Sequence, residues 1–283
     1  MAPVAQVAHR DWPVPCACDD VQVTSDLERE YSPSSRVGGD SSPFLAAYRA
    51  DSVAAQTALA DKLTVLADGT ILVVEDPSAP LLVFIHGGYW QALSAAESLA
   101  LAPRALARGW SYAAVDYTIA PEGSVAQMVD ECAAALSAVS GAVSPSSVVL
   151  AGHSAGAHLA AMVSLVSTSV LPIDRTVLLS GVFDLRPLLH TTVNDPLGLD
   201  ESAAIALSPQ LLPVVASHDV VVAWGDNETE AFKSQSRSYA AHLVGCGLHV
   251  ASFECAGRHH FDIMDDLIVP DTELGRHAMG GAK

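Results

Sequence analysis

Positive charge is scarce in this sequence. Its 283 residues include 14 lysines and arginines against 32 aspartates and glutamates, which gives a formal net charge of −18. A protein that binds nucleic acid or an anionic membrane needs basic surface, because phosphate groups are negatively charged. We therefore expect neither nucleic acid nor a membrane among the partners of this chain.

Long apolar runs are also missing, although 50% of the residues are hydrophobic. No uninterrupted run reaches about 18 residues, the length that indicates a transmembrane helix. The first residues, MAPVAQVAHRDWPVP, lack a basic start followed by a long apolar segment, so we predict no secretory signal. A chain of this length and hydrophobicity can bury the core of one large α/β domain.

Cysteine is sparse and scattered, at Cys16, Cys18, Cys132, Cys246 and Cys255. An odd, scattered set is typical of reduced thiols in the cytosol rather than of a disulfide framework. Cys16 and Cys18 have no matching Cys or His pair at the spacing of a zinc site. We expect a cytoplasmic protein with no metal and no cofactor.

Apolar strands alternate with helical segments along most of the chain. We predict eight strands, of which the first two form an antiparallel start. They cover residues 63–69, 70–76, 81–88, 111–117, 148–154, 176–184, 219–226 and 248–255. Such alternation is typical of a mostly parallel, doubly wound sheet with helices on both faces.

Two segments depart from this alternation. Residues 1–60 predict an N-terminal helical extension, with two helical pieces on either side of a Ser/Pro/Gly-rich loop. Residues 61–283 predict the main α/β domain. Within it, residues 185–213 break into short helical pieces that indicate a small cap over the substrate pocket.

The most informative stretch is VVLAGHSAGAHLA, at residues 148–160. A buried strand ends in GHSAG and passes into a sequence rich in Ala and Leu that predicts a helix. Glycines on both sides of Ser154 are expected where a side chain would collide with neighbouring backbone. This pattern is typical of a nucleophile elbow, which lifts the serine Oγ out of the sheet.

Polar groups gather at the predicted carboxyl ends of the strands, where open α/β sheets bind ligands. They are HGGYW at 86–90, Asp116, Tyr117, Ser154, Asp184, Asp226, Glu228, His259 and His260. The order serine, acid, histidine is that of the α/β-hydrolases. One edge of the sheet therefore carries every side-chain type that nucleophilic acyl transfer requires.

Two histidines after the last strand are candidates for the base that takes the proton of Ser154. We favour His260 over His259, because the adjoining Phe261 can pack and fix the loop. His153, inside the elbow, is interpreted as a packing or pocket-wall residue.

The third member must orient the histidine and stabilise its charged form. Glu228 lies three residues beyond Gly225, in the usual position of the acid in this fold, and is our preferred candidate. Asp226 is the second candidate and could instead cap the following helix. Asp184, at the end of the preceding strand, is a third.

HGGYW predicts an oxyanion hole. Two glycines after a buried strand let the backbone approach a substrate oxygen, so the amides of Gly88 and Tyr89 can join that of Ala155. Trp90 and His158 are expected to bind the substrate from the pocket wall. Aromatic surface near the reacting centre favours a flat or aromatic group in the substrate.

These motifs resemble the kynurenine formamidase (arylformamidase) branch of the α/β-hydrolases. The matching pieces are LEREYSPSS, HGGYWQ, DYTIAP, GHSAGAHLAA, SGVFDLRPLL, NDPLGLDESAAIALSP, ETEAFKSQS and HHFDIMDDL. The resemblance implies an α/β-hydrolase fold with Ser154, Glu228 and His260 as the catalytic triad. It also implies that LEREYSPSS packs near the pocket mouth. The chain departs from the branch at residues 229–231, where Pro is frequent.

The sequence therefore leads to a serine hydrolase that cleaves a small N-acyl arylamide through an acyl-enzyme. The acyl group is formyl or short to medium, and the amine is of the kynurenine or anthranilate type. The alternative is a carboxylesterase that uses the same groups on small esters. A non-catalytic binding protein is a third hypothesis, against which the intact Ser–acid–His order speaks. We expect a small-molecule substrate and allow for a homodimer.

Overall fold

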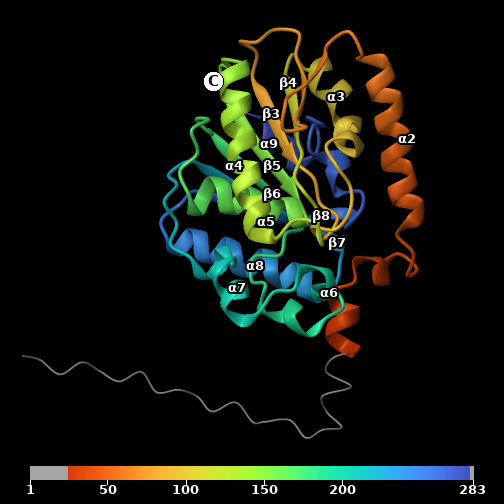
Figure 1. The fold of residues 1–283 in the computed structure, drawn as a ribbon, viewed down its shortest axis with the longest axis vertical. Coiled ribbons are helices and arrows are strands. Elements are labelled where there is room, and N and C mark those ends of the chain that lie inside the picture. The colour runs from red at the N-terminus through yellow and green to blue at the C-terminus, as the bar shows by residue number, and fades with distance from the viewer. Residues whose placement is uncertain (1–24, 281–283) are drawn as a thin grey trace, which may run out of the picture.

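The computed structural model describes residues 25–280 of the chain. The predictions for Cys16, Cys18 and the start of the chain lie outside these residues. One eight-stranded sheet runs through the molecule, with helices on both of its faces (Figure 1).

The strand order is β1-β2-β4-β3-β5-β6-β7-β8. The strands are β1 (Leu63–Val65), β2 (Ile71–Val73), β3 (Leu81–Ile85), β4 (Ser111–Val115), β5 (Val148–His153), β6 (Arg175–Leu179), β7 (Asp219–Asn227) and β8 (Val250–His259). Strands β3 to β8 are parallel, whereas β2 pairs antiparallel with both β1 and β4. The predicted eight-stranded, mostly parallel sheet with an antiparallel start is confirmed.

Strand β3 shows why the sheet lies inside the protein. Leu81, Val83 and Ile85 belong to one hydrophobic core, and Leu82 and Phe84 belong to the other. All five side chains are at most 2% exposed. Because successive side chains point to opposite faces, a strand that is covered on both faces has a continuous apolar sequence.

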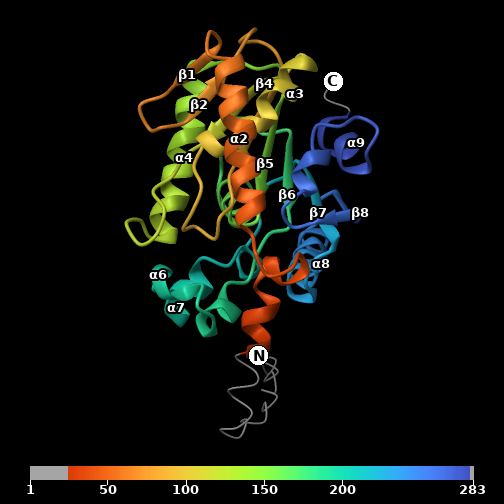
Figure 2. The same cartoon turned by 90° about the vertical axis from the view of Figure 1, so that its right-hand side faces the viewer.

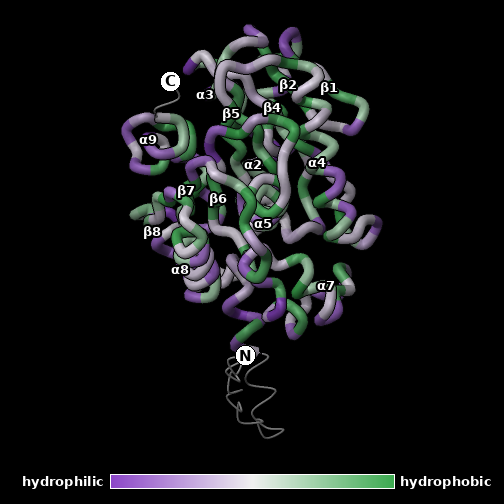
Figure 3. Tube along the Cα trace, turned by 90° about the vertical axis from the view of Figure 1, so that its left-hand side faces the viewer, coloured by the Kyte–Doolittle hydropathy of each residue, from purple (hydrophilic) through white to green (hydrophobic). Residues whose placement is uncertain are grey.

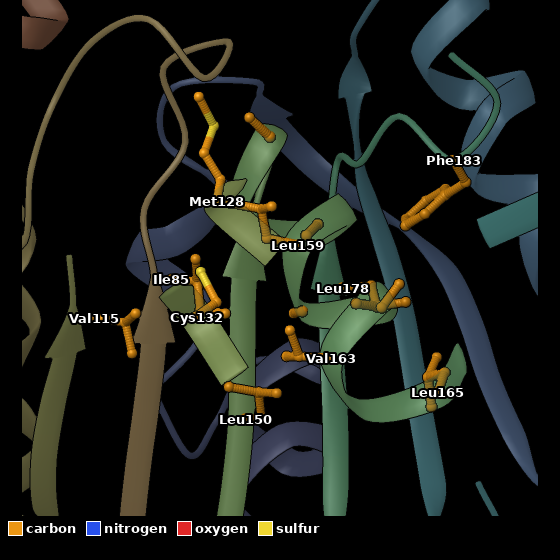
Figure 4. Packing of buried hydrophobic residues seen from close by; sticks show 14 of the residues in the cluster. Ile85, Val115, Met128, Cys132, Leu150, Leu159, Val163, Leu165, Leu178 and Phe183 are labelled. Atoms are coloured by element: carbon orange, nitrogen blue, oxygen red, sulfur yellow. The ribbon is translucent and has the colours of Figure 1, made fainter. Parts of the chain in front are cut away.

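Helices within residues 25–280 cover both faces of the sheet. The first core includes side chains of α4 (Val125–Ala142), α5 (Ala155–Ala161) and α8 (Glu230–Gly245), and the second includes side chains of α2 (Ser42–Ala58), α3 (Ala102–Ala107) and α9 (Glu273–Met279). Figures 1 and 2 show α2 and α4 on opposite sides of the strands. In the first core, Met128 and Cys132 of α4, Leu159 of α5 and Ile85 of β3 belong to one cluster of buried side chains (Figure 4).

Shorter turns complete the chain. They are the helical residues 25–30, the 3-10 turns η1 (Pro33–Arg36), η2 (Ala96–Leu101), η4 (Arg186–His190), η5 (Pro209–Leu211) and η6 (Ile263–Asp266), the π-helical turn η3 (Met162–Val166), and the helices α6 (Asn194–Leu197) and α7 (Glu201–Ala206). Residues 185–213 thus consist of short helical pieces, as their sequence predicts.

The structure differs from the sequence expectation near the C-terminus. Strand β8 continues to His259, so this histidine ends a strand instead of lying in a loop. Helix α9 was not predicted. It buries Leu274, Ala278 and Met279 in the second core, but it is only seven residues long. A periodic pattern is hard to recognise over two turns.

Hydrophobic residues follow the central strands, and hydrophilic ones gather at the outer turns (Figure 3). Among the residues that the structure describes, no helix is long and apolar enough to span a membrane.

Candidate active site

Ser154 lies at the sharp turn between β5 and α5. Its backbone has φ 55° and ψ −120°, a conformation that is rare for a residue with a side chain, and its side chain is buried. A Cβ atom at Gly152 would overlap the carbonyl oxygen of Gly156, and one at Gly156 would overlap that of Ile85. The glycines of GHSAG are therefore required by the close approach of α5 to strands β5 and β3.

The side chains of His260 and Glu228 meet in the interior. Nδ1 of His260 lies 3.1 Å from Oε2 of Glu228, and the two side chains are 5% and 1% exposed. Oε1 of Glu228 accepts hydrogen bonds from Ser180 Oγ at 2.5 Å and from the Gly225 amide at 2.6 Å. The carboxylate is held from several directions, so it can fix the orientation of the imidazole ring.

Ser154 and His260 line the same cavity, together with Gly87 and Gly88. Within residues 25–280, no hydrogen bond joins Ser154 Oγ to the imidazole. Such contacts are often long in unliganded enzymes and tighten when the substrate binds.

The turn after β3 lines this cavity and contains backbone amides without an acceptor in the described residues. Gly88 has φ 96° and Tyr89 has φ 51°, and a Cβ at Gly88 would overlap the backbone of Ala92. In the described part of the chain, the N–H groups of Gly88, Tyr89 and Ala155 donate to no acceptor. Three unpaired donors close to a serine can stabilise an oxyanion.

Aromatic side chains hold the turn after β3 in place. Tyr117 Oη donates to the carbonyl oxygens of His86, at 3.0 Å, and Gly87, at 3.2 Å. The His86 ring stacks on Tyr117 with a centroid distance of 4.2 Å. Both side chains are buried, so the backbone around Gly88 is rigidly supported.

Comparison with known proteins identifies the family of this chain. Residues 82–223 match the family model described as alpha/beta hydrolase fold. Kynurenine formamidase of Danio rerio is 38% identical over 202 residues, which cover 68% of this chain and 69% of the relative. The chain belongs to the kynurenine formamidase branch of the α/β-hydrolases. Kynurenine formamidase of Drosophila melanogaster is 32% identical over 215 residues, covering 70% of this chain and 71% of the relative.

A solved structure extends the similarity over most of this α/β-hydrolase. A candidate thioesterase from Silicibacter sp. has a TM-score of 0.80 and 28% sequence identity, covering 90% of this chain and 99% of that one.

The other acids and histidines considered from the sequence lie elsewhere. Asp226 Oδ2 accepts from the Gly257 amide, and Asp184 forms an ion pair with Arg186 at 2.7 Å. His259 Nδ1 accepts from the Phe261 amide at 3.1 Å. No hydrogen bond or ion pair in the described residues joins Asp226 or Asp184 to His260.

His153 lies against His260 as a buried pocket-wall residue. Its Nε2 is 2.8 Å from the His260 carbonyl oxygen, and the two ring centroids are 4.7 Å apart. Burial, followed by the nearness of His260, holds the pKa of His153 well below its usual range. The neutral ring can donate its Nε2 proton to the carbonyl and so fix the main chain that carries His260.

Trp90 and His158, expected as substrate contacts, do not line the cavity. Both are 0% exposed, and their rings meet edge to face at 5.2 Å. Nε2 of His158 bonds to the Leu207 carbonyl at 2.7 Å, which links α5 to the cap. These large side chains are part of the buried core, so we leave them out of the proposed substrate contacts.

The N-terminal segment contributes more to the cavity than the sequence suggests. Of residues 185–213, only Thr192 and Val193 line it, whereas residues 28–51 supply an entire wall. Phe44 of α2 stacks on Phe261 at 4.9 Å with an angle of 7°. The Tyr48 hydroxyl donates to the Phe261 carbonyl oxygen. The sequence analysis did not identify Phe44 and Tyr48 as cavity residues. Two aromatic residues four positions apart on a predicted helix lie on one face, which could have indicated them.

The segment LEREYSPSS lies at the cavity, as the resemblance implies. Glu28, Tyr31, Ser32 and Ser34 all line it. The Tyr89 hydroxyl donates to the Tyr31 carbonyl oxygen, which connects this segment to the turn after β3.

Metal-binding side chains do not cluster in the described region. Residues 25–280 contain no group of three or more His, Cys, Asp or Glu placed to hold an ion. The sequence expectation of a site without metal or cofactor stays a prediction.

Proposed function

We propose that this α/β-hydrolase cleaves the amide bond of small N-acyl arylamides by way of an acyl-enzyme. The acyl group is formyl or short to medium, and the amine is of the kynurenine or anthranilate type. Two observations carry this proposal: His260 contacts the buried Glu228, and His260 lines the same cavity as Ser154. The relatives' name, kynurenine formamidase, supports the substrate class.

In the first half of the reaction, Ser154 Oγ attacks the carbonyl carbon and its proton passes to Nε2 of His260. Glu228 accepts from Nδ1–H and stabilises the imidazolium that forms. The electron pair of the carbonyl moves onto oxygen, where the amides of Gly88, Tyr89 and Ala155 stabilise it. Each such donor contributes roughly a hundred- to a thousand-fold in kcat.

In the second half, the electron pair on the oxyanion re-forms the carbonyl double bond and the C–N bond breaks. His260 gives its proton to the departing nitrogen. An arylamine leaves more easily than an alkylamine, because the ring delocalises the lone pair of nitrogen. Water then attacks the acyl-enzyme with His260 as base, and the acid is released as Ser154 regains its proton.

The test is a panel of N-acyl arylamines assayed with purified protein and with Ser154→Ala. We expect free arylamine and free acid from the wild type and neither product from the variant. Cleavage of p-nitrophenyl esters without any arylamine product would reject the amidase proposal.

A carboxylesterase is the second candidate, because the similar Silicibacter structure is described as a candidate thioesterase, whose substrates are also activated acyl compounds. The two are separated by kcat/KM for an ester and an amide that share one acyl group and one aryl ring. For an esterase, the ratio of kcat/KM for the ester to that for the amide should be close to the ratio of the uncatalysed rates. For an amidase, this ratio should be smaller.

A further inference from the structure

We infer that the main chain of Glu30 and Tyr31 positions the catalytic groups, because it bridges the turn after β3 and the loop that carries the proposed triad acid. This inference rests on the proposed function, since it concerns the proposed oxyanion hole and triad. It makes the hydroxyl groups of Tyr89 and Thr229 positioning groups, which act through other residues and not on the substrate.

Two hydroxyl groups hold successive carbonyl oxygens of the N-terminal segment. The Tyr89 hydroxyl donates to the carbonyl oxygen of Tyr31, and the Thr229 hydroxyl donates to that of Glu30 at 2.5 Å. The Tyr89 amide belongs to the proposed oxyanion hole, and Thr229 directly follows Glu228, the proposed triad acid. Two adjacent peptide groups therefore connect two parts of the proposed machinery that lie far apart in the sequence.

The Thr229 hydroxyl is available for this contact because it does not cap helix α8. Thr229 is the N-cap residue of α8, a position where a threonine side chain usually accepts from an amide of the first turn. Its side chain makes no such bond here, and Oε2 of Glu30 accepts from the Ala231 amide at 3.2 Å. The N-terminal segment thus supplies a cap to α8 and receives the threonine hydroxyl.

The Tyr31 side chain extends the bridge towards the proposed base. It is 6% exposed, its ring lies 6.2 Å from that of Phe232, and its hydroxyl accepts from Nε2 of Gln235 at 3.0 Å. The Phe232 ring in turn meets the His260 ring edge to face, with a centroid distance of 4.7 Å. The segment therefore packs against the side chain that supports His260.

Tyr89 has the greatest need of such support, because its backbone is strained. Its φ of 51° is rare for a residue with a side chain and persists only where surrounding contacts maintain it. Those contacts are the Phe232 ring, at 6.3 Å, the Trp90 ring, at 6.1 Å, and the Tyr31 carbonyl oxygen. Loss of the hydroxyl contact should let the turn relax, and a shift of about 1 Å can cost roughly a hundred-fold in rate.

The first test is Tyr89→Phe, which keeps the ring and removes only the hydroxyl. We expect kcat to fall by roughly ten- to a hundred-fold with little change in KM, because a displaced oxyanion donor weakens transition-state binding alone. The Ki of a trifluoromethyl ketone, which forms a tetrahedral adduct with a catalytic serine, should rise by the factor by which kcat/KM falls.

Tyr239→Phe is the matched control for this test. It also removes one buried hydroxyl from a tyrosine, but that hydroxyl has no hydrogen-bond partner among the residues that the structure describes. The kcat, KM and Ki of this variant should equal those of the wild type.

The second test breaks the bridge at its other end with Thr229→Val. Valine keeps the branched shape of threonine, and no helix cap is lost with the hydroxyl. We expect the same pattern of lowered kcat and raised Ki. Because both hydroxyls act through one segment, the double variant should be no more than about two-fold slower than the slower single variant. Effects that multiply in the double variant would overturn the bridge.

The outcomes separate this inference from the proposed function. If Tyr89→Phe and Thr229→Val keep the wild-type kcat and Ki, the inference is wrong while the amidase proposal stands. If the wild type releases no arylamine from any N-acyl arylamine, the proposed function fails, and a p-nitrophenyl ester and the ketone still test the bridge. If one variant does not fold, the other decides by the same measurements.

Discussion

At the scale of single residues, strain and burial concentrate around the proposed reacting groups. Ser154, Tyr89 and Ser180 all have positive φ, which costs about 1–3 kcal/mol at each non-glycine position. Ser154 is the proposed nucleophile, the Tyr89 amide belongs to the proposed oxyanion hole, and Ser180 holds Glu228. Strained backbone that the surrounding structure maintains is typical of functional sites.

Ser154→Ala should abolish covalent labelling by a fluorophosphonate probe, because the variant has no hydroxyl to form the bond. The labelled protein is detected by mass spectrometry. Ser98→Ala, which removes a hydroxyl that also lines the cavity, is the matched control and should still be labelled. Labelling of Ser154→Ala at the wild-type rate would place the nucleophile elsewhere.

Glu228→Gln should lower kcat by roughly 10⁴-fold, the loss known for Asp→Asn in the triad of a serine protease. The amide cannot stabilise the imidazolium and favours the wrong tautomer of His260. Asp226→Asn is the matched control, because Asp226 contacts the Gly257 amide and is exposed. If steady-state kinetics show the larger loss for Asp226→Asn, the choice of Glu228 is wrong.

At the scale of elements, α2 and α5 connect the site to distant parts of the chain. Helix α2 reaches the loop after β8 through Phe44 and Tyr48. Helix α5 reaches the cap through His158, which burial keeps neutral by lowering its pKa to about 4. Helix α2 thus meets the loop after β8 through two half-buried side chains, and α5 meets the cap through one buried histidine.

The pH dependence of stability should reflect His158. Its pKa is about 4 in the folded protein against an ordinary value of 6.5, so between these values the unfolded chain binds more protons. The free energy of unfolding should therefore fall as the pH is lowered from about 6.5 towards 4, by about 3 kcal/mol in total from this residue.

Urea unfolding at about pH 7 and about pH 5 measures this effect in His158→Gln. The variant should lose less stability on acidification than the wild type. His190→Gln, which removes an exposed histidine of the cap, should behave as the wild type does. Equal acid sensitivity of His158→Gln and the wild type would contradict the assignment.

At the scale of the whole molecule, the negative charge extends into the cavity. Its lining includes Glu28, Asp51, Glu97, Asp262 and Asp265, and no Lys or Arg from residues 25–280. Three of these carboxylates have an arginine within 3.4–3.6 Å. The pairs are Glu97 with Arg49, Asp262 with Arg258, and Asp265 with Arg104. Glu28 and Asp51 have no cationic partner in this part of the chain.

The negatively charged cavity lining should make the enzyme cleave neutral substrates faster than anionic ones. An N-acyl anthranilate should have a lower kcat/KM than its neutral methyl ester. Added salt screens the charges and should reduce this difference in kcat/KM. Glu28→Gln should narrow it as well. Glu30→Gln removes the same charge two residues away, outside the cavity lining, and serves as the control. Faster cleavage of the anion at low salt would contradict this prediction.

Much of the architecture could be predicted because it depends on local patterns. Continuous apolar runs identified all eight strands, and GHSAG identified the turn at Ser154, since only glycine allows the packing found at Gly152 and Gly156. The placement of Trp90 and His158 could not be predicted. Their sequence neighbours suggest a pocket wall, and only the fold shows that the indole and imidazole face the core.

The sequence by itself determined the fold class and family, because strand periodicity, glycine spacing and the order of Ser154, Glu228 and His260 are properties of the chain alone. Tertiary structure decided which carboxylate touches His260 and which segment encloses the cavity. Both depend on contacts across long sequence separations, such as Glu228 to Ser180 and Phe44 to Phe261. No local pattern encodes which of several nearby acids or helices the folded chain will bring into contact.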